Sequence, residues 1–340
     1  MDLVEFINGL PKAELHLHIE GTLEPEMMLA LAQRNQVSIP FQTVEEIRQA
    51  YQFQNLQEFL DIYYRGMSVL VTEQDFYDLT YAYLERCAQE NVIHTELFFD
   101  PQGHTERGIA FEQVVNGVSR ALDHGLTKLK ITSRLIMCFL RHLDEASALA
   151  TLEQAMPYRD KIIGVGLDSS ELGHPPEKFN RVFAKAREAG FRCVAHAGEE
   201  GPSEYVWGAI NDLKVDRIDH GNRSLEDGKL IHALAEQQIP LTVCPLSNLK
   251  LRVVNDLTHH PLLEMMNKGL MTTVNSDDPA YFGGYINKNF SQIARALNLN
   301  AKHLATLAEN SFKASFLPEQ EKAKHIDKVA SYVVGYHDVH

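Results

Sequence analysis

Eight short runs of apolar and β-branched residues, separated by segments with helical periodicity, constrain the fold of this chain more than any other feature. Several runs are almost continuously apolar, which is typical of strands buried on both faces of a sheet. Strands that alternate with helices predict a parallel sheet, and eight of them in one unit favour a closed barrel. The predicted strands cover residues 13–19, 93–99, 130–137, 162–167, 193–196, 217–220, 240–244 and 271–275.

A length of 340 residues suits one barrel with insertions. We therefore predict an α/β fold, a (β/α)8 barrel of the TIM type, that occupies residues 1–340 as a single domain. A helical insertion, roughly residues 21–91, separates the first and second strands. Apolar residues recur in it at helical spacing, and this helix either packs on the barrel or forms a lid over its active face. These residues are Leu56, Phe59, Leu60, Tyr63, Tyr64 and Met67.

Composition and charge exclude several classes of function. The formal net charge of -14 would repel a polyanion, so neither nucleic acid nor an anionic membrane is an expected partner. No apolar run is long enough to span a bilayer. The first ten residues carry acidic side chains and no basic segment, so we expect no signal peptide and a cytoplasmic location. The four cysteines lack C-x-x-C spacing and are expected to be reduced thiols.

Polar side chains follow four of the predicted strands. His16 and His18 end the first strand, and alternate residues of a strand point to the same side. Two neutral imidazoles side by side suit a borderline metal such as Zn²⁺. A His-x-His pair is also common by chance, and taken alone it is as compatible with a structural role.

Two further histidines end the fifth and sixth strands. His196 is followed by Ala-Gly-Glu199, which brings a carboxylate into the loop where a ligand would lie. Asp219 precedes His220 and could fix its tautomer or complete a hydrogen-bond network. The structural alternatives are a strand-end histidine with a solvated glutamate, and a satisfied core histidine.

The eighth strand ends in two adjacent acidic residues, Asp277 and Asp278. Such a pair at the mouth of a barrel is unfavourable without a cation or hydrogen-bond donors nearby, although a solvated turn would also accept it. In a closed barrel all these strand ends converge on one face. Three imidazoles and a carboxylate around one ion leave room for a water molecule, as a catalytic site requires.

The metal count is predicted to be one. Two-metal barrels usually need a bridging ligand, often a modified lysine on the fourth strand. Here that strand ends in Asp168-Ser169-Ser170-Glu171, which contains no lysine.

The order of these four motifs resembles the adenosine/adenine deaminase family of the amidohydrolase superfamily, over residues 11 to about 290. The resemblance implies one Zn²⁺ per subunit, with Fe²⁺ as the alternative. It also implies attack of a metal-activated hydroxide on C6 of a purine. Glu199 would be the general acid at N1, His220 would orient or deprotonate the water, and Asp278 would bind N7. The implied metal ligands are His16, His18, His196 and Asp277.

Within that family the chain is most similar to the enzymes that act on adenine. Glu20 stands where adenosine deaminases carry an aspartate that serves the ribose, so it is a candidate for the N9 or N3 edge of a free base. Glu171 stands near the place where a glycine backbone approaches the purine, and Ser170 beside it is a further substrate-binding candidate. The implied reaction converts adenine to hypoxanthine and ammonia in purine salvage.

Three alternatives remain open on the sequence. The first is the same chemistry on adenosine or another adenine nucleoside. The second is a two-metal barrel that hydrolyses a phosphoester or a lactam. The third is a barrel without chemistry that binds a purine or a partner protein. The sequence leaves the oligomeric state open.

Overall fold

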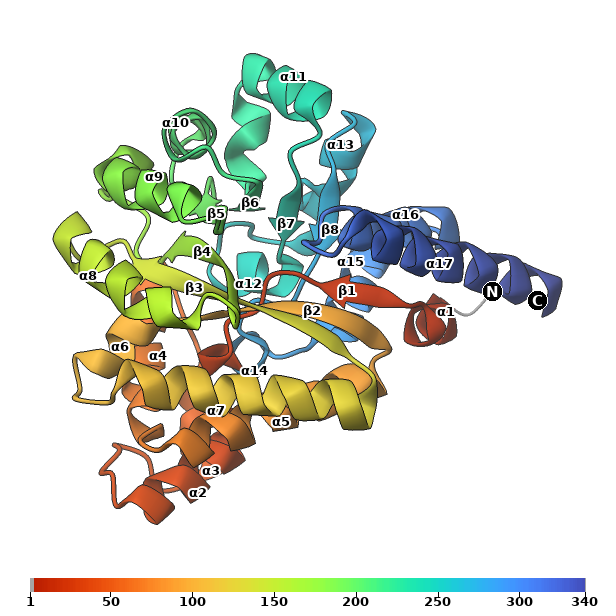
Figure 1. Ribbon diagram of the computed structural model, residues 1–340. Coiled ribbons are helices and arrows are strands. Elements are labelled where there is room, and N and C mark those ends of the chain that lie inside the picture. The colour runs from red at the N-terminus through yellow and green to blue at the C-terminus, as the bar shows by residue number, and fades with distance from the viewer. Residues whose placement is uncertain (1–2, 340) are drawn as a thin grey trace.

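Eight parallel strands form the centre of the molecule, in the order β1 to β8 (Figure 1). The computed structural model describes residues 3–339, so Met1, Asp2 and His340 of the predicted domain lie outside the described residues. Every predicted strand overlaps an observed one, which confirms the TIM-type barrel. The strands are β1 Lys12–Glu14, β2 Val92–Phe99, β3 Thr132–Leu140, β4 Ile162–Asp168, β5 Arg192–Ala197, β6 Arg217–His220, β7 Leu241–Val243 and β8 Thr272–Val274.

The barrel closes through the segment that follows β1. This strand is shorter than predicted, because His16 and His18 lie in an extended segment that pairs by isolated bridges. Leu17 bridges to Asp277 beyond β8, and the His18 N–H donates to the Asp277 carbonyl at 3.0 Å. The closure thus brings two predicted ligand segments side by side.

Helices surround the strands. On the N-terminal half they are α1 Leu3–Gly9, α2 Pro25–Asn35, α3 Val44–Ala50, α4 Leu56–Gly66, α5 Glu73–Gln89, α6 Pro101–Thr105, α7 Phe111–His124 and α8 Glu145–Ala155. On the C-terminal half they are α9 Asn180–Glu188, α10 Ser203–Gly208, α11 Gly228–Gln237, α12 Pro245–Lys250, α13 Leu262–Asn267, α14 Pro279–Phe282, α15 Ile286–Ala296, α16 Ala301–Lys313 and α17 Glu319–Val339. Among the described residues, no helix is both long and apolar enough to cross a lipid bilayer.

The segment between β1 and β2 contains α2 to α5, and α2, α3 and α4 gather at the lower left of Figure 1. Helix α4 starts where Asn55 caps it, because the Asn55 side chain accepts a hydrogen bond from the Glu58 N–H. Helix α5 starts at a reciprocal capping box between Thr72 and Asp75. These caps fix where α4 and α5 begin. The apolar side of α4 faces inward.

The core is continuous along the chain. One apolar cluster includes residues from Phe6 in α1 to Tyr336 in α17. Between β2 and β6, Arg217 Nη1 lies 2.6 Å from Glu96 Oε2, and both side chains are fully buried. All four cysteines are buried free thiols, as predicted. The apolar packing and the buried ion pair hold the strand ends in fixed positions.

Candidate active site

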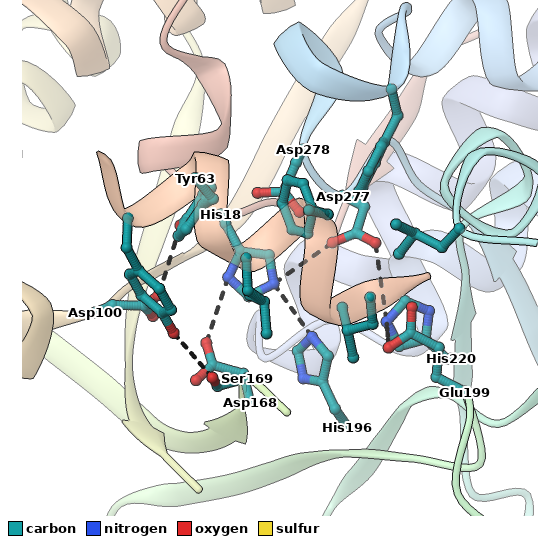
Figure 2. A pocket seen from close by; sticks show the side chains of 16 residues that line it. His18, Tyr63, Asp100, Asp168, Ser169, His196, Glu199, His220, Asp277 and Asp278 are labelled. Atoms are coloured by element: carbon teal, nitrogen blue, oxygen red, sulfur yellow. Dashed lines mark hydrogen bonds and ion pairs between the residues drawn. The ribbon is translucent and has the colours of Figure 1, made fainter. Parts of the chain in front are cut away.

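The predicted polar residues meet at the C-terminal ends of the strands (Figure 2). His196 lies near the end of β5, and His220 is the last residue of β6. His18 follows β1 and Asp277 follows β8, where the two segments pair. Residues far apart in the sequence therefore face one cavity.

Four side chains form a group with the geometry of a metal site. One atom from each of His16, His18, His196 and Asp277 lies within 4.8 Å of the others. His18 Nε2 lies 3.1 Å from His196 Nε2, and Asp277 Oδ1 lies 3.3 Å from His16 Nε2. His16 Nε2 is buried without a hydrogen-bond partner among the described residues. Converging nitrogen and carboxylate ligands of this kind fit a divalent cation.

Asp219 and Thr242 orient two of these imidazoles from behind. The Thr242 hydroxyl donates to Asp219 Oδ1 at 2.9 Å. Because its hydrogen is used in that bond, the Thr242 oxygen accepts from His16 Nδ1, also at 2.9 Å. Asp219 Oδ2 lies 3.6 Å from His196 Nδ1. With Nδ1 of His16 protonated, its Nε2 keeps its lone pair for a metal. His196 Nδ1 and Asp219 Oδ2 have no hydrogen-bond partner among the described residues, so Asp219 acts on His196 through its charge.

Glu199 and His220 lie beside the ligand group, with Glu199 Oε2 3.5 Å from His220 Nε2. Burial raises the pKa of Glu199 well above its usual value, and the Asp277 carboxylate raises it further. Burial lowers the pKa of His220 to about 3. The glutamate can therefore hold a proton near neutral pH while the imidazole stays neutral.

The backbone is strained where these side chains enter the cavity. His220 has a φ of 66° and Asp277 a φ of 64°, in the left-handed region that residues other than glycine rarely adopt. Such conformations cost free energy and persist where the surrounding structure enforces them, as it often does at functional sites.

Glu171 is not among the residues that line the cavity, and its contact with the substrate stays a prediction. Its carboxylate accepts hydrogen bonds from the backbone N–H groups of Gly198, Glu199, Glu200 and Gly201, at 2.7 to 3.1 Å. Four donors occupy both of its oxygens. Glu171 thus fixes the loop that carries Glu199.

Ser170 and Glu20 do not line the cavity either, and their contacts with the substrate stay predictions. The Ser170 hydroxyl donates to Gln57 on α4 at 2.8 Å. Glu20 is fully buried, and its Oε1 accepts from the Asp100 N–H at 3.1 Å and from His104 Nε2 at 2.8 Å. Glu20 therefore supports the residues around Asp100.

Asp278 does line the cavity, as its predicted role requires. Its Oδ1 is buried without a partner among the described residues. A Cβ atom at Gly21 would collide with this carboxylate, so the glycine is required for the close approach of the two segments. The Asp278 side chain is therefore held at the cavity by its close packing against Gly21.

Two acidic residues that the sequence motifs did not indicate also line the cavity. Asp100 directly follows β2, and Asp168 is the last residue of β4. Asp168 Oδ2 lies 3.4 Å from His18 Nδ1, and Asp100 Oδ2 lies 3.5 Å from the Tyr63 hydroxyl. Their position at strand ends was the available signal, since the same signal pointed to the predicted metal ligands.

Helix α4 covers the cavity with side chains that include Phe59, Leu60 and Tyr63. The insertion therefore lies over the active face of the barrel, and its movement as a lid stays a prediction.

The chain matches known proteins over nearly its whole length. Residues 11–332 match the family model described as adenosine deaminase. An adenine deaminase from Acinetobacter baylyi is 61% identical over 329 residues, which cover 97% of this chain and 99% of the relative. Another from Sphingopyxis alaskensis is 61% identical over 327 residues, covering 96% of each chain.

Solved structures are also similar to this chain over nearly its whole length. The crystal structure of adenine deaminase from Arthrobacter aurescens has 51% identity and a TM-score of 0.94, covering 96% of this chain and 99% of that one. An amidohydrolase from Burkhoderia ambifaria, solved with bound Zn, has 27% identity and a TM-score of 0.88, covering 98% of this chain and 94% of that one.

Proposed function

The chain belongs to the adenosine deaminase family and catalyses the hydrolytic deamination of adenine, and we propose that it does so with one zinc ion held by four residues. The observation that carries the proposal is the convergence of these side chains beside Glu199 in a lidded cavity. The proposed ligands are His16, His18, His196 and Asp277.

Each reacting group has a defined task in this proposal. When bound, the ion lowers the pKa of water and so supplies a nucleophile near neutral pH. His220, neutral because of its burial, accepts a proton from the attacking water. Glu199 donates a proton to N1 of the purine, so the ring accepts electrons as C6 becomes tetrahedral. Ammonia then leaves and hypoxanthine remains.

Substrate orientation follows from the same groups. Glu199 faces N1, so N7 lies on the other side of C6. Asp278 lines the cavity, and burial raises its pKa well above the usual value, so we assign its carboxylic acid to N7 as a hydrogen-bond donor. The reacting carbon then lies next to the metal ligands.

Zinc is proposed because imidazole nitrogen and carboxylate oxygen are among its usual ligands and its coordination can expand to include the water, and Fe²⁺ is the alternative because it accepts the same ligands. Elemental analysis of the purified protein tests this, with one equivalent of zinc as the expected result. Two equivalents would contradict the single-ion proposal.

The deciding experiment measures kcat/KM for adenine and for adenosine with metal-replete protein. Adenine should be the better substrate. Faster turnover of adenosine would refute the assignment of a free base. The Glu199→Gln variant controls for contaminating activity, because it should retain metal and lose turnover.

We infer that residues 1–340 act as one barrel domain in cytoplasmic purine salvage. A small purine base is the proposed partner, and nucleic acid is not, since the net charge of -14 would repel it.

A further inference from the structure

We propose that Asp100 selects the free base, by accepting a hydrogen bond from the N9–H group of adenine. The inference rests on the proposed function, because it assigns a second edge of the same substrate. It moves the specificity contact from Glu20, which the sequence suggested, to the residue that Glu20 supports.

Asp100 is a buried carboxylate that lacks donors. It is 2% exposed and lines the cavity. Its Oδ1 has no hydrogen-bond partner among the described residues, and its Oδ2 lies 3.5 Å from the Tyr63 hydroxyl. The Asp168 carboxyl, a second acidic group, is its other side-chain hydrogen-bond partner. Burial of a carboxylate without donors is costly, so such a group in a ligand cavity implies a donor on the ligand.

The orientation of the purine identifies that donor. C6 must lie at the metal ligands and N1 at Glu199. In Figure 2, Glu199 and Asp100 lie on opposite sides of the cavity, with His18 between them. The edge of the purine away from N1 carries N7 and N9, and Asp278 is assigned to N7. Asp100 is therefore left to face N9.

N9 is also the atom at which a free base and a nucleoside differ. Adenine can carry a proton there, whereas adenosine carries its sugar. A bound nucleoside has no N9–H group to donate to Asp100, and its ribose would have to fit into the space beside this side chain. Sites built around one polar contact can reject analogues that lack it by about 10⁴–10⁵-fold.

Glu20 is a positioning residue in this scheme. Its carboxylate holds the Asp100 backbone N–H at 3.1 Å and is itself held by His104 at 2.8 Å. The Asp100 main chain is therefore fixed, and the side chain is presented to the cavity.

A second cation site is the competing interpretation of these residues. One atom each of His18, Asp100 and Asp168 lies within 4.8 Å of the others. A second ion would, however, need to share His18 with the first ligand group. Metal analysis decides the matter, since two equivalents bound in the unaltered protein and one in the Asp100 variant would overturn the proposal.

The test compares adenine with 9-methyladenine, which has no N9–H, in the unaltered protein and in Asp100→Ala. Loss of one hydrogen bond to a charged group should lower kcat/KM for adenine by about 10–100-fold. The loss should fall mainly on KM, because the contact is remote from C6. The value for 9-methyladenine should change little or rise, so the preference for adenine shrinks.

Two variants accompany this measurement. Asp100→Asn should be intermediate, because its amide oxygen still accepts a hydrogen bond, and it serves if Asp100→Ala does not fold. Asp123→Asn, an exposed position on α7, is the matched control and should keep the full preference.

The outcomes separate the two claims. An unaltered protein that deaminates adenine, together with Asp100 variants that keep the full adenine preference, refutes the role of Asp100 and leaves the proposed function intact. An unaltered protein that prefers adenosine refutes the proposed function itself.

Discussion

Replacing Asp219 with asparagine should weaken metal binding without touching a ligand. Asp219 is fully buried, and its two oxygens serve two different imidazoles, through Thr242 to His16 and directly toward His196 at 3.6 Å. An amide side chain has an oxygen that accepts and an NH₂ group that donates. The NH₂ group would therefore face either the Thr242 hydroxyl or the His196 ring, where an acceptor is needed. Loss of such supporting contacts typically costs about 10–100-fold in metal affinity.

Competition for Zn²⁺ with a chromophoric chelator measures this affinity, and circular dichroism verifies the fold. Asp212→Asn removes a carboxylate from an exposed position in the same βα unit and should leave the affinity unchanged. An Asp219→Asn protein that binds zinc as tightly as the unaltered protein would refute the orienting role. Equal weakening in both variants would indicate a general effect of lost negative charge.

Three further outcomes are expected. Glu199→Gln should lower adenine turnover by about 10²–10⁴-fold while the bound metal, measured by elemental analysis, stays constant. Glu171→Ala should lower kcat more than it raises KM in steady-state assays, because it frees the loop of Glu199; a rise in KM alone would restore the predicted substrate contact. Glu96→Gln should lower the free energy of unfolding by about 3–5 kcal/mol in urea titrations, because it leaves Arg217 buried without its partner. Burial opposes ionisation of Glu96, but Arg217 and His94 bring its pKa down to about 2, so this stabilisation is complete above the ordinary pKa near 4.5 and is lost as the pH falls toward 2. The difference in free energy of unfolding between Glu96→Gln and the unaltered protein should therefore become smaller over that pH range. A constant difference would contradict the ion-pair account.

The barrel could be predicted from the sequence because burial on both faces makes each strand a distinct apolar run. The first strand was predicted too long for a related reason. His16, Leu17 and His18 are buried and extended like strand residues, yet they pair only through isolated bridges. Periodicity reports burial and extension, and it does not report the hydrogen-bond ladder that defines a strand.

The substrate contacts were harder to predict than the metal ligands. Motif position indicates which strand end a residue occupies, but not where its carboxylate points. Glu171 turns toward four backbone N–H groups, and Glu20 turns toward His104. Asp100 and Asp168 were overlooked because a single acidic residue after a strand is common in turns. Only the register of neighbouring strands brings them together.

The acidic character of the cavity unites these observations. Asp100, Asp168 and Asp278 each present a buried oxygen without a partner among the described residues, and Asp277 adds a fourth carboxylate at the metal ligands. In an apolar interior this arrangement is unfavourable unless charge or donors are supplied. The proposed cation compensates the charge of Asp277. The N9–H group of a free base supplies a donor to Asp100 at the other end of the cavity. A nucleoside lacks the N9–H donor, so the proposed metal site and the proposed selection of the free base follow from the same shortage of donors in the cavity.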